Sequence, residues 1–296
     1  MKRLLKWLAS LVGIVLLAIV GLFTFAWFKT EHELARQYVV ADPPLVVPTD
    51  AAALARGAHL FTVMGCGECH GAGGVGNLLG DVPVARIAAP NLTPPALAGR
   101  YDADGIAAAI RHGVRPDGTP LRFMPAGDFH QLSDDDTAAL VAHVQALPPS
   151  NNDPGPFKVK PLGRVLAVLG KMHLTPAAGI DHAPRTRVAP PAGPTAEYGA
   201  YLAQACTGCH GADFAGQHVP GTPPHFPDAA NLTPHASGIG AWSLEDFQRA
   251  LRTGTRPDGR KLDDFMPWKA YATFSDEEIA AVYAHLRTVP ARASAK

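Results

Sequence analysis

The chain has 296 residues, with 26 basic and 26 acidic side chains and therefore no net charge. The absence of a basic excess argues against nucleic-acid binding, and an apolar content of 47% is ample for a buried core. Residues 50–148 and 195–290 each carry a net charge of −4, whereas residues 149–194 carry +4. This basic segment is either a solvated linker or a surface that docks against the acidic modules or against anionic lipid.

The N-terminus contains a long run without a charged side chain, Trp7–Phe28. A helix of this length spans about 33 Å, enough to cross the hydrocarbon core of a bilayer. Lys2, Arg3 and Lys6 precede the run, so the positive-inside rule places the N-terminus in the cytoplasm. We expect an uncleaved transmembrane anchor over residues 1–29.

A cleaved signal peptide is the alternative for this segment, although it offers only a poor cleavage site. Both interpretations place the rest of the chain outside the cytoplasm, in a bacterial periplasm. Residues 30–49 are then a connector to the first folded module.

The remainder of the chain is a duplicated module of about 100 residues. The matching strings recur at a nearly constant offset, and a Pro-rich linker over 149–194 separates the copies. We therefore predict domains at 50–148 and 195–290 and a tail at 291–296. The matching strings are Gly57–Leu60 and Gly199–Leu202, Asn91–Pro94 and Asn231–Pro234, Ile110–Gly118 and Leu251–Gly259, Phe123–Pro125 and Phe265–Pro267, and Ser133–Asp134 and Ser275–Asp276.

Each module has the pattern of short helices and loops, without convincing alternating strands, which predicts an all-α fold. Helices are expected over Ala51–Met64 and Ala196–Ala205, and a short one within Leu162–Leu174 of the linker. Ser275 and Glu278 predict a capping box at the start of the last helix. In the first copy Ser133 and Asp136 take these positions, and an apolar stripe follows in both. The stripes are Leu140, Val141, Val144 and Leu147 in the first copy, and Ile279, Val282, Tyr283 and Leu286 in the second.

All four cysteines lie in two five-residue motifs, Cys66–His70 (CGECH) and Cys206–His210 (CTGCH). Three interpretations compete for them. A redox dithiol needs no adjacent histidine, and a shared zinc site leaves the duplication of everything else unexplained. Covalent haem of the c type uses every residue of the motif. Its vinyl groups form thioethers with Cys66, Cys69, Cys206 and Cys209, and His70 and His210 bind the two irons.

A ligand for the opposite face of each iron is predicted from the methionines. Of the five in the chain, only Met124 and Met266 occupy equivalent positions in the repeats, at nearly the same distance after the motif histidines. Both precede a proline. Methionine as the sixth ligand raises the haem potential, and a cavity is expected between each methionine and its histidine. Of the remaining histidines, His59 and His112 are matched by Tyr201 and Thr253, whereas His143 and His285 match each other on the last helix of each module, where a surface or core role is expected.

With these motifs the chain resembles the class I c-type cytochromes, in particular the cytochrome subunits of membrane-bound bacterial alcohol, aldehyde and gluconate dehydrogenases. The motifs, the two NLTP strings and the segment from Gly238 to Pro290 carry the resemblance, which covers about 50–148 and 195–290. Those subunits commonly carry three haems, whereas this chain has motifs for two. The resemblance implies that five side chains lie near the haem edges: Asn91, Asn231, Arg115, Arg256 and Trp242.

The leading functional hypothesis is a membrane-anchored, periplasmic di-haem cytochrome that transfers electrons and is not itself an enzyme. Its donor would be a dehydrogenase or a quinol-oxidising complex, and its acceptor a soluble cytochrome or a terminal oxidase. The alternative is a di-haem enzyme of the peroxidase or thiosulfate-oxidising type, which needs one open or displaceable iron position. A sensor or assembly protein that uses haem structurally is a third hypothesis.

Overall fold

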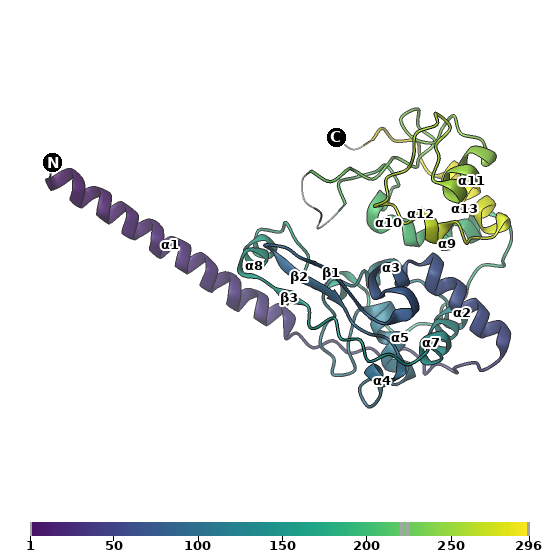
Figure 1. Cartoon of the computed structure of the whole chain (residues 1–296), viewed down its shortest axis with the longest axis horizontal. Helices are drawn as coiled ribbons and strands as arrows, with labels where there is room; N and C mark the ends of the chain where they lie inside the picture. The colour runs from purple at the N-terminus through teal and green to yellow at the C-terminus, as the bar shows by residue number, and fades with distance from the viewer. Residues whose placement is uncertain (1, 220–221, 223–224, 295–296) are drawn as a thin grey trace.

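The computed structural model describes residues 2–219, 222 and 225–294, which form a long N-terminal helix and two helical modules that lie side by side (Figure 1). The first module, residues 50–148, contains α2 (Ala51–Val63), α3 (Cys66–His70), η1 (Ala72–Gly74), α4 (Pro94–Leu97), α5 (Ala103–His112), α6 (Ala126–Phe129) and α7 (Asp134–Gln145). The second module, residues 195–290, contains α9 (Ala196–Leu202), α10 (Gln204–His210), α11 (Leu244–Thr253), α12 (Trp268–Tyr271) and α13 (Asp276–Thr288). Helices α2, α3, α5, α6 and α7 therefore have counterparts in α9 to α13.

In each module the first and last helices cross in close contact, α2 with α7 and α9 with α13. Glycines at equivalent positions permit this approach. A Cβ on Gly57 would lie 2.0 Å from the carbonyl oxygen of Ala139, and one on Gly199 would lie 1.8 Å from that of Ala281. Any side chain there would push the helices apart, which explains why this glycine is shared by the two repeats.

The last helix of each module begins as predicted. Ser275 and Glu278 form the expected capping box on α13, with reciprocal hydrogen bonds of 2.9 and 3.0 Å. On α7, Ser133 accepts a hydrogen bond from the backbone of Asp136 at 3.1 Å, whereas the Asp136 carboxylate is turned to other partners. The predicted stripes of both helices are buried apart from Tyr283, which is partly exposed.

The first module departs from the all-helical expectation by a small antiparallel sheet in the order β1-β2-β3. Its strands are β1 (Asn77–Asp81), β2 (Ala85–Ala89) and β3 (Lys158–Val159). Its pattern was not visible in the sequence because the register shifts between Leu78 and Gly80 and because β3 is only two residues long and comes from the linker. A two-stranded hairpin is marginal alone, so the linker strand completes the unit.

The N-terminal helix α1 (Lys2–Leu34) extends beyond the predicted anchor. Its last turns bury Ala26, Thr30 and Leu34, which lie one turn apart on a single face. That face packs against α8 (Pro161–Val168), the helix expected within Leu162–Leu174, which ends before Gly170. Among the described residues, α1 is the one helix long and apolar enough to span a membrane.

Both the connector and the linker are fixed to the first module. Asp42 of the connector accepts hydrogen bonds from His112 (2.9 Å) and Arg187 (2.7 Å), and Arg111 lies 3.3 Å away. Arg111 and His112 are almost fully buried. His112, whose equivalent in the second repeat is Thr253, therefore binds the connector. This contact has no counterpart among the described residues of the second module.

Candidate haem sites

The first cysteine motif forms the short helix α3, which follows α2 after a turn at Gly65 in the left-handed conformation. His70 is buried, and its Nδ1 donates a hydrogen bond of 2.8 Å to the carbonyl oxygen of Pro90. This bond fixes the tautomer, so that Nε2 carries a lone pair. A metal-binding histidine is commonly oriented in this way.

The second motif repeats this geometry. It ends α10, and the Nδ1 of His210 donates a hydrogen bond of 2.7 Å to the carbonyl oxygen of Ala230. In both copies the acceptor lies 20 residues after the histidine and directly before the asparagine of the NLTP string. The NLTP strings therefore recur in part because the preceding carbonyl orients the histidine.

The cysteine environments distinguish between the three interpretations of the motifs. Burial raises the pKa of the Cys66 and Cys206 thiols to about 12, whereas redox-active dithiols have lowered pKa values. Within the described part of the chain, no three His, Cys, Asp or Glu side chains converge on one metal position, as a zinc site would require. A haem iron needs only a histidine and one further ligand, because the porphyrin supplies four nitrogens.

The two predicted methionine ligands lie at equivalent places. Met124 precedes Pro125, which caps α6, and Met266 precedes Pro267, which caps α12. Both methionines are partly buried and pack against the apolar core, as do Cys66 and Cys206. Their assignment as ligands, and the cavity expected beside each, remain predictions.

The side chains of the asparagines expected at the haem edges form hydrogen bonds with backbone groups. The Asn91 amide donates to the carbonyl oxygens of Ser150 and Asn152 at 2.8 and 3.0 Å, and its oxygen accepts from Thr93. Asn231 bonds in the same way to Thr233 and to the carbonyl oxygen of Arg292. Each asparagine thus ties the NLTP loop to the chain that leaves its module, and a haem contact remains a prediction.

The expected arginines differ from each other. Arg115 donates to its own turn, at Thr119 and Pro120. The Nε of Arg256 is buried without a hydrogen-bond partner among the described residues, and so is the Nε of Arg122. Burial also lowers the pKa of Arg122, with the charge of Arg115 adding to the effect. Each module thus has one arginine with a buried Nε that lacks a hydrogen-bond partner among the described residues, although that of Arg256 lies 4.0 Å from the Asp258 carboxylate. Such a guanidinium group suits the carboxylate of a haem propionate.

Sequence reasoning did not identify Arg122 because its equivalent in the second repeat is Asp264. It did identify Trp242, which is partly buried and packs against the core as Tyr101 does in the first module. The backbone carbonyl of Trp242 accepts a hydrogen bond of 2.7 Å from Tyr283.

Two side chains between the modules lie beside the second motif and were also missed. Asp128 of α6 accepts a hydrogen bond of 3.4 Å from Thr207, and burial raises the pKa of its carboxyl to about 6. A Cβ on Gly208 would lie 2.4 Å from the Asp128 carboxylate. Burial, with the nearby Cys206 sulfur, raises the pKa of Tyr271 well above its ordinary value. The motif glycine of α10 thus lets the first module approach the second haem site.

The contact between the modules is reciprocal. His59 donates to Glu278 at 2.9 Å, and Tyr201 donates to Asp136 at 2.7 Å. Because His59 is equivalent to Tyr201 in the repeat and Glu278 to Asp136, each module supplies a ring donor and a carboxylate to the other. Arg56 bridges the two contacts, with bonds of 2.8 Å to Asp136 and 3.3 Å to Glu278.

The comparison with protein families decides between the interpretations. The family model named Cytochrome c matches residues 54–148 and 196–290, which together make up well over half of the chain. The chain belongs to the cytochrome c family. Membership in this family implies a covalently bound haem c in each of the two cytochrome c domains.

Known relatives of these cytochrome c domains include subunits of dehydrogenases. The gluconate 2-dehydrogenase cytochrome c subunit of Pantoea cypripedii is 42% identical over 94 residues, covering 29% of this chain and 21% of that protein. The fructose dehydrogenase cytochrome subunit of Gluconobacter japonicus is 38% identical over 103 residues, covering 32% and 21%. The cytochrome c subunit of the alcohol dehydrogenase (quinone) of Gluconacetobacter polyoxogenes is 26% identical over 280 residues, covering 81% and 57%. The chain thus spans between about a fifth and just over half of these relatives.

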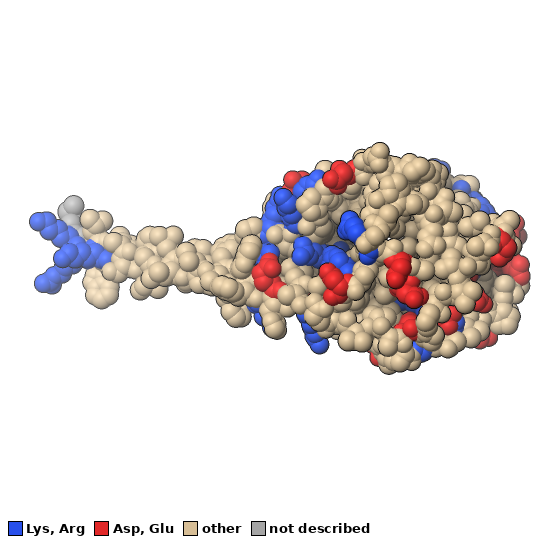
Figure 2. Space-filling model, turned by 90° about the horizontal axis from the view of Figure 1, so that it is seen from below, with Lys and Arg blue, Asp and Glu red and all other residues tan. Residues whose placement is uncertain are grey.

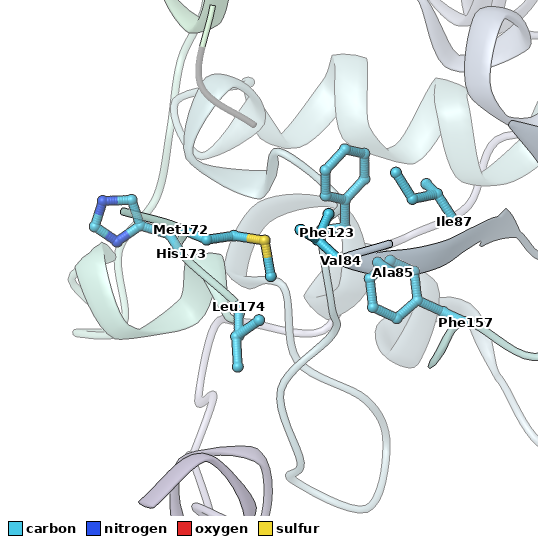
Figure 3. Close-up of a pocket in the computed structure, with 8 residues that line it drawn as sticks. All are labelled: Val84, Ala85, Ile87, Phe123, Phe157, Met172, His173 and Leu174. Atoms are coloured by element: carbon cyan, nitrogen blue, oxygen red, sulfur yellow. The ribbon is translucent and has the colours of Figure 1, made fainter. Parts of the chain in front are cut away.

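A small apolar pocket lies outside both motifs, in the first module (Figure 3). It is lined by Val84, by Ile87 of β2, by Phe123, and by Phe157 and Met172 of the linker. Its volume of about 20 Å³ has room for about one water molecule. It therefore represents packing between the hairpin and the linker and not a ligand site.

Proposed function

We propose that this chain is a membrane-anchored, periplasmic di-haem cytochrome c that carries electrons within or beside a dehydrogenase complex. It passes them to a soluble cytochrome or a terminal oxidase. Each haem, when bound, supplies a one-electron couple. The domains are taken as residues 50–148 and 195–290, with the anchor preceding them.

The observation that carries the proposal is the pair of histidines whose Nδ1 atoms are fixed by equivalent backbone carbonyls, at Pro90 and Ala230. In each domain this arrangement leaves the Nε2 lone pair free, so that His70 and His210 would bind the iron of a haem that the neighbouring cysteines attach. Met124 and Met266, at equivalent positions, would close the other face. An iron with both axial positions filled has no place for substrate, which favours an electron carrier over the di-haem enzyme.

The thioethers would be formed by Cys66 and Cys69 in the first domain and by Cys206 and Cys209 in the second. Arg122 and Arg256, whose buried Nε atoms lack a hydrogen-bond partner among the described residues, would each donate to a propionate. Asn91, Asn231, Arg115 and Trp242 would support the haem edges through the loops that they hold in place.

The membrane anchor is supported by the length of α1 and by the charges at its start. Its apolar stretch is exposed along most of its length, as a lipid-facing helix requires, and Lys2, Arg3 and Lys6 lie at the end that would face the cytoplasm. The chain would then cross the inner membrane once. The haem domains would lie in the periplasm.

A dehydrogenase is proposed as the electron donor because the relatives are dehydrogenase subunits by name. A quinol-oxidising complex is the other donor that the arrangement permits. Two haem domains held together by the reciprocal contacts of His59 and Tyr201 would act as a relay, because electrons can enter at one domain and leave at the other.

The test is an optical redox titration of the full chain, matured in a periplasm that attaches haem, with carbon monoxide added to the reduced form. We expect two high-potential, low-spin haems that do not bind carbon monoxide. A haem that binds carbon monoxide in the unmodified protein would contradict the methionine assignments and favour the di-haem enzyme.

A further inference from the structure

The position of α8 relative to α1 places part of the linker at the level of the bilayer surface. A groove between the two helices brings the start of α8 beside the end of the charge-free run of α1. The groove is lined by Phe23, Thr24, Trp27, Phe28, Pro161 and Arg164. Phe23–Phe28 form the last stretch of about 8 Å of the apolar run, so residues level with them lie at the outer edge of the hydrocarbon core, next to the head groups.

Arg164 holds this position. Its guanidinium group lies over the ring of Trp27, 3.9 Å from the centroid, and donates to Thr30 at 2.6 Å and to Glu31. Further along the linker, Thr175 donates to Glu33 at 2.9 Å. The linker therefore rises along α1 from the level of Phe28 to that of Glu33, and the start of α8 is its part closest to the bilayer.

The turn between β1 and β2 reaches the same level. The backbone of Lys160 donates to the carbonyl oxygen of Val84 at 3.0 Å, and its side chain pairs with Asp81. A Cβ on Gly163 would lie 2.2 Å from that same carbonyl oxygen, so α8 packs directly on the turn. The turn, α8 and the end of α1 thus pack together as one unit (Figure 1).

This unit exposes apolar side chains beside the end of the apolar run of α1. Leu162 at the start of α8 is 44% exposed and Val82 in the turn is 37% exposed, with Pro83 and Pro161 exposed beside them. We call these four residues the membrane-proximal tip. Figure 2 shows lysine and arginine side chains gathered at the end of the globular part where α1 joins it. Lys158, next to the tip, is exposed and forms no ion pair with any residue that the structure describes.

We propose that the membrane-proximal tip is a second contact with the bilayer, in which Leu162 and Val82 enter the head-group region and Lys158 binds anionic phospholipid. The inference rests on the membrane anchor of the proposed function. Its occupant is the bilayer surface because the tip is continuous with the helix that crosses the membrane and carries the matching charge. The contact would hold the first domain at the membrane and leave the second domain further out.

The experiment places the photoreactive residue benzoylphenylalanine at single positions of the haem-loaded full chain in nanodiscs of phosphatidylcholine and anionic phosphatidylglycerol. We expect Leu162→benzoylphenylalanine to give at least about tenfold more lipid adduct than Glu277→benzoylphenylalanine, at the exposed start of α13. We also expect Lys158→Glu to reduce the adduct at position 162 at least about threefold. Arg260→Glu, an exposed site in the second domain with the same charge change, should not reduce it.

Leu16→benzoylphenylalanine, within α1, separates this proposal from the anchor itself. Lipid adducts at position 16 together with equal yields at 162 and 277 would overturn the second contact while the anchor stands. An absence of adducts at position 16 would overturn the anchor and the second contact together. An adduct yield at 162 that does not change with Lys158→Glu would overturn the role of anionic lipid.

Discussion

The reciprocal contact between the two domains can be measured through one pair, His59 and Glu278. Both side chains are largely removed from water, with 26% and 8% of their surface exposed, and the Nε2 of His59 lies 2.9 Å from the carboxylate. A hydrogen bond to a charged group contributes about 1.5–3 kcal/mol. Since Arg56 shares the same carboxylate, we expect the lower part of this range, about 1.5–2 kcal/mol, for the pair alone.

A double-mutant cycle isolates this quantity. Glu278→Ala also removes the capping box of α13, which costs about 1 kcal/mol, but that loss cancels in the cycle with His59→Ala. The measurement is the free energy of unfolding of the four proteins by urea, followed by circular dichroism. The matched control pairs His59→Ala with Glu277→Ala, since Glu277 lies one residue earlier in α13 and is exposed. A coupling energy below about 0.3 kcal/mol in the first cycle, the scatter expected of independent sites, would refute the contact.

The same pair has a defined pH dependence. Burial alone raises the pKa of Glu278, but the hydrogen bond from His59, the backbone N–H of Ser275 and the charge of Arg56 together lower it below its ordinary 4.5. A lowered carboxyl pKa gives stability that is fully present above pH 4.5 and is lost as the pH falls through the folded-state pKa. The advantage of the unmodified chain over Glu278→Gln should therefore shrink in acid.

Three further predictions concern the connector, the helix crossing and the iron ligands. Asp42→Asn should lower the free energy of unfolding by about 2 kcal/mol at pH 7, because hydrogen bonds outweigh the effect of burial and lower the pKa of Asp42 from 3.8 to about 2. In urea unfolding this loss should decline as the pH falls from 3.8 to 2. A loss that is independent of pH would contradict the prediction. Gly199→Ala should lower the free energy of unfolding by more than about 3 kcal/mol in the same assay, since the added Cβ would lie 1.8 Å from the Ala281 carbonyl oxygen. A change below about 1 kcal/mol would show that α9 and α13 separate freely. Met124→Ala and Met266→Ala should each make one haem, and not both, bind carbon monoxide in the reduced state, and a variant whose spectrum is unchanged by the gas would exclude that methionine as a ligand.

The repeat made much of each domain predictable from the sequence. The capping serines, the buried stripes of α7 and α13 and the equivalence of the two motifs follow from local patterns that recur at a nearly fixed offset. The orientation of His70 and His210 by carbonyls further along the chain was outside these patterns, because a backbone acceptor has no residue type. It explains afterwards why the NLTP strings stay at a constant distance from the motifs.

The remaining features depend on contacts between segments that are distant in the sequence. The sheet needs a two-residue strand from the linker, so no local alternation could indicate it. The extension of α1 to Leu34 depends on Arg164, which lies 134 residues after its partner Thr30. Asp128 and Tyr271 are significant only because the domains face each other. The repeats differ at both positions, since Ala270 is equivalent to Asp128 and Phe129 is equivalent to Tyr271.

The exchange of equivalent contacts between the domains has an evolutionary consequence. A donor at position 59 or 201 meets a carboxylate at position 278 or 136, which is the pattern expected when two copies of one subunit associate about a twofold axis. A single-domain ancestor with these residues would have been able to pair with itself before the gene was duplicated. Fusion would then have preserved an existing dimer and freed each half to change separately. The two halves of the old dimer could then take on different surroundings, one beside the anchor helix and the other away from it.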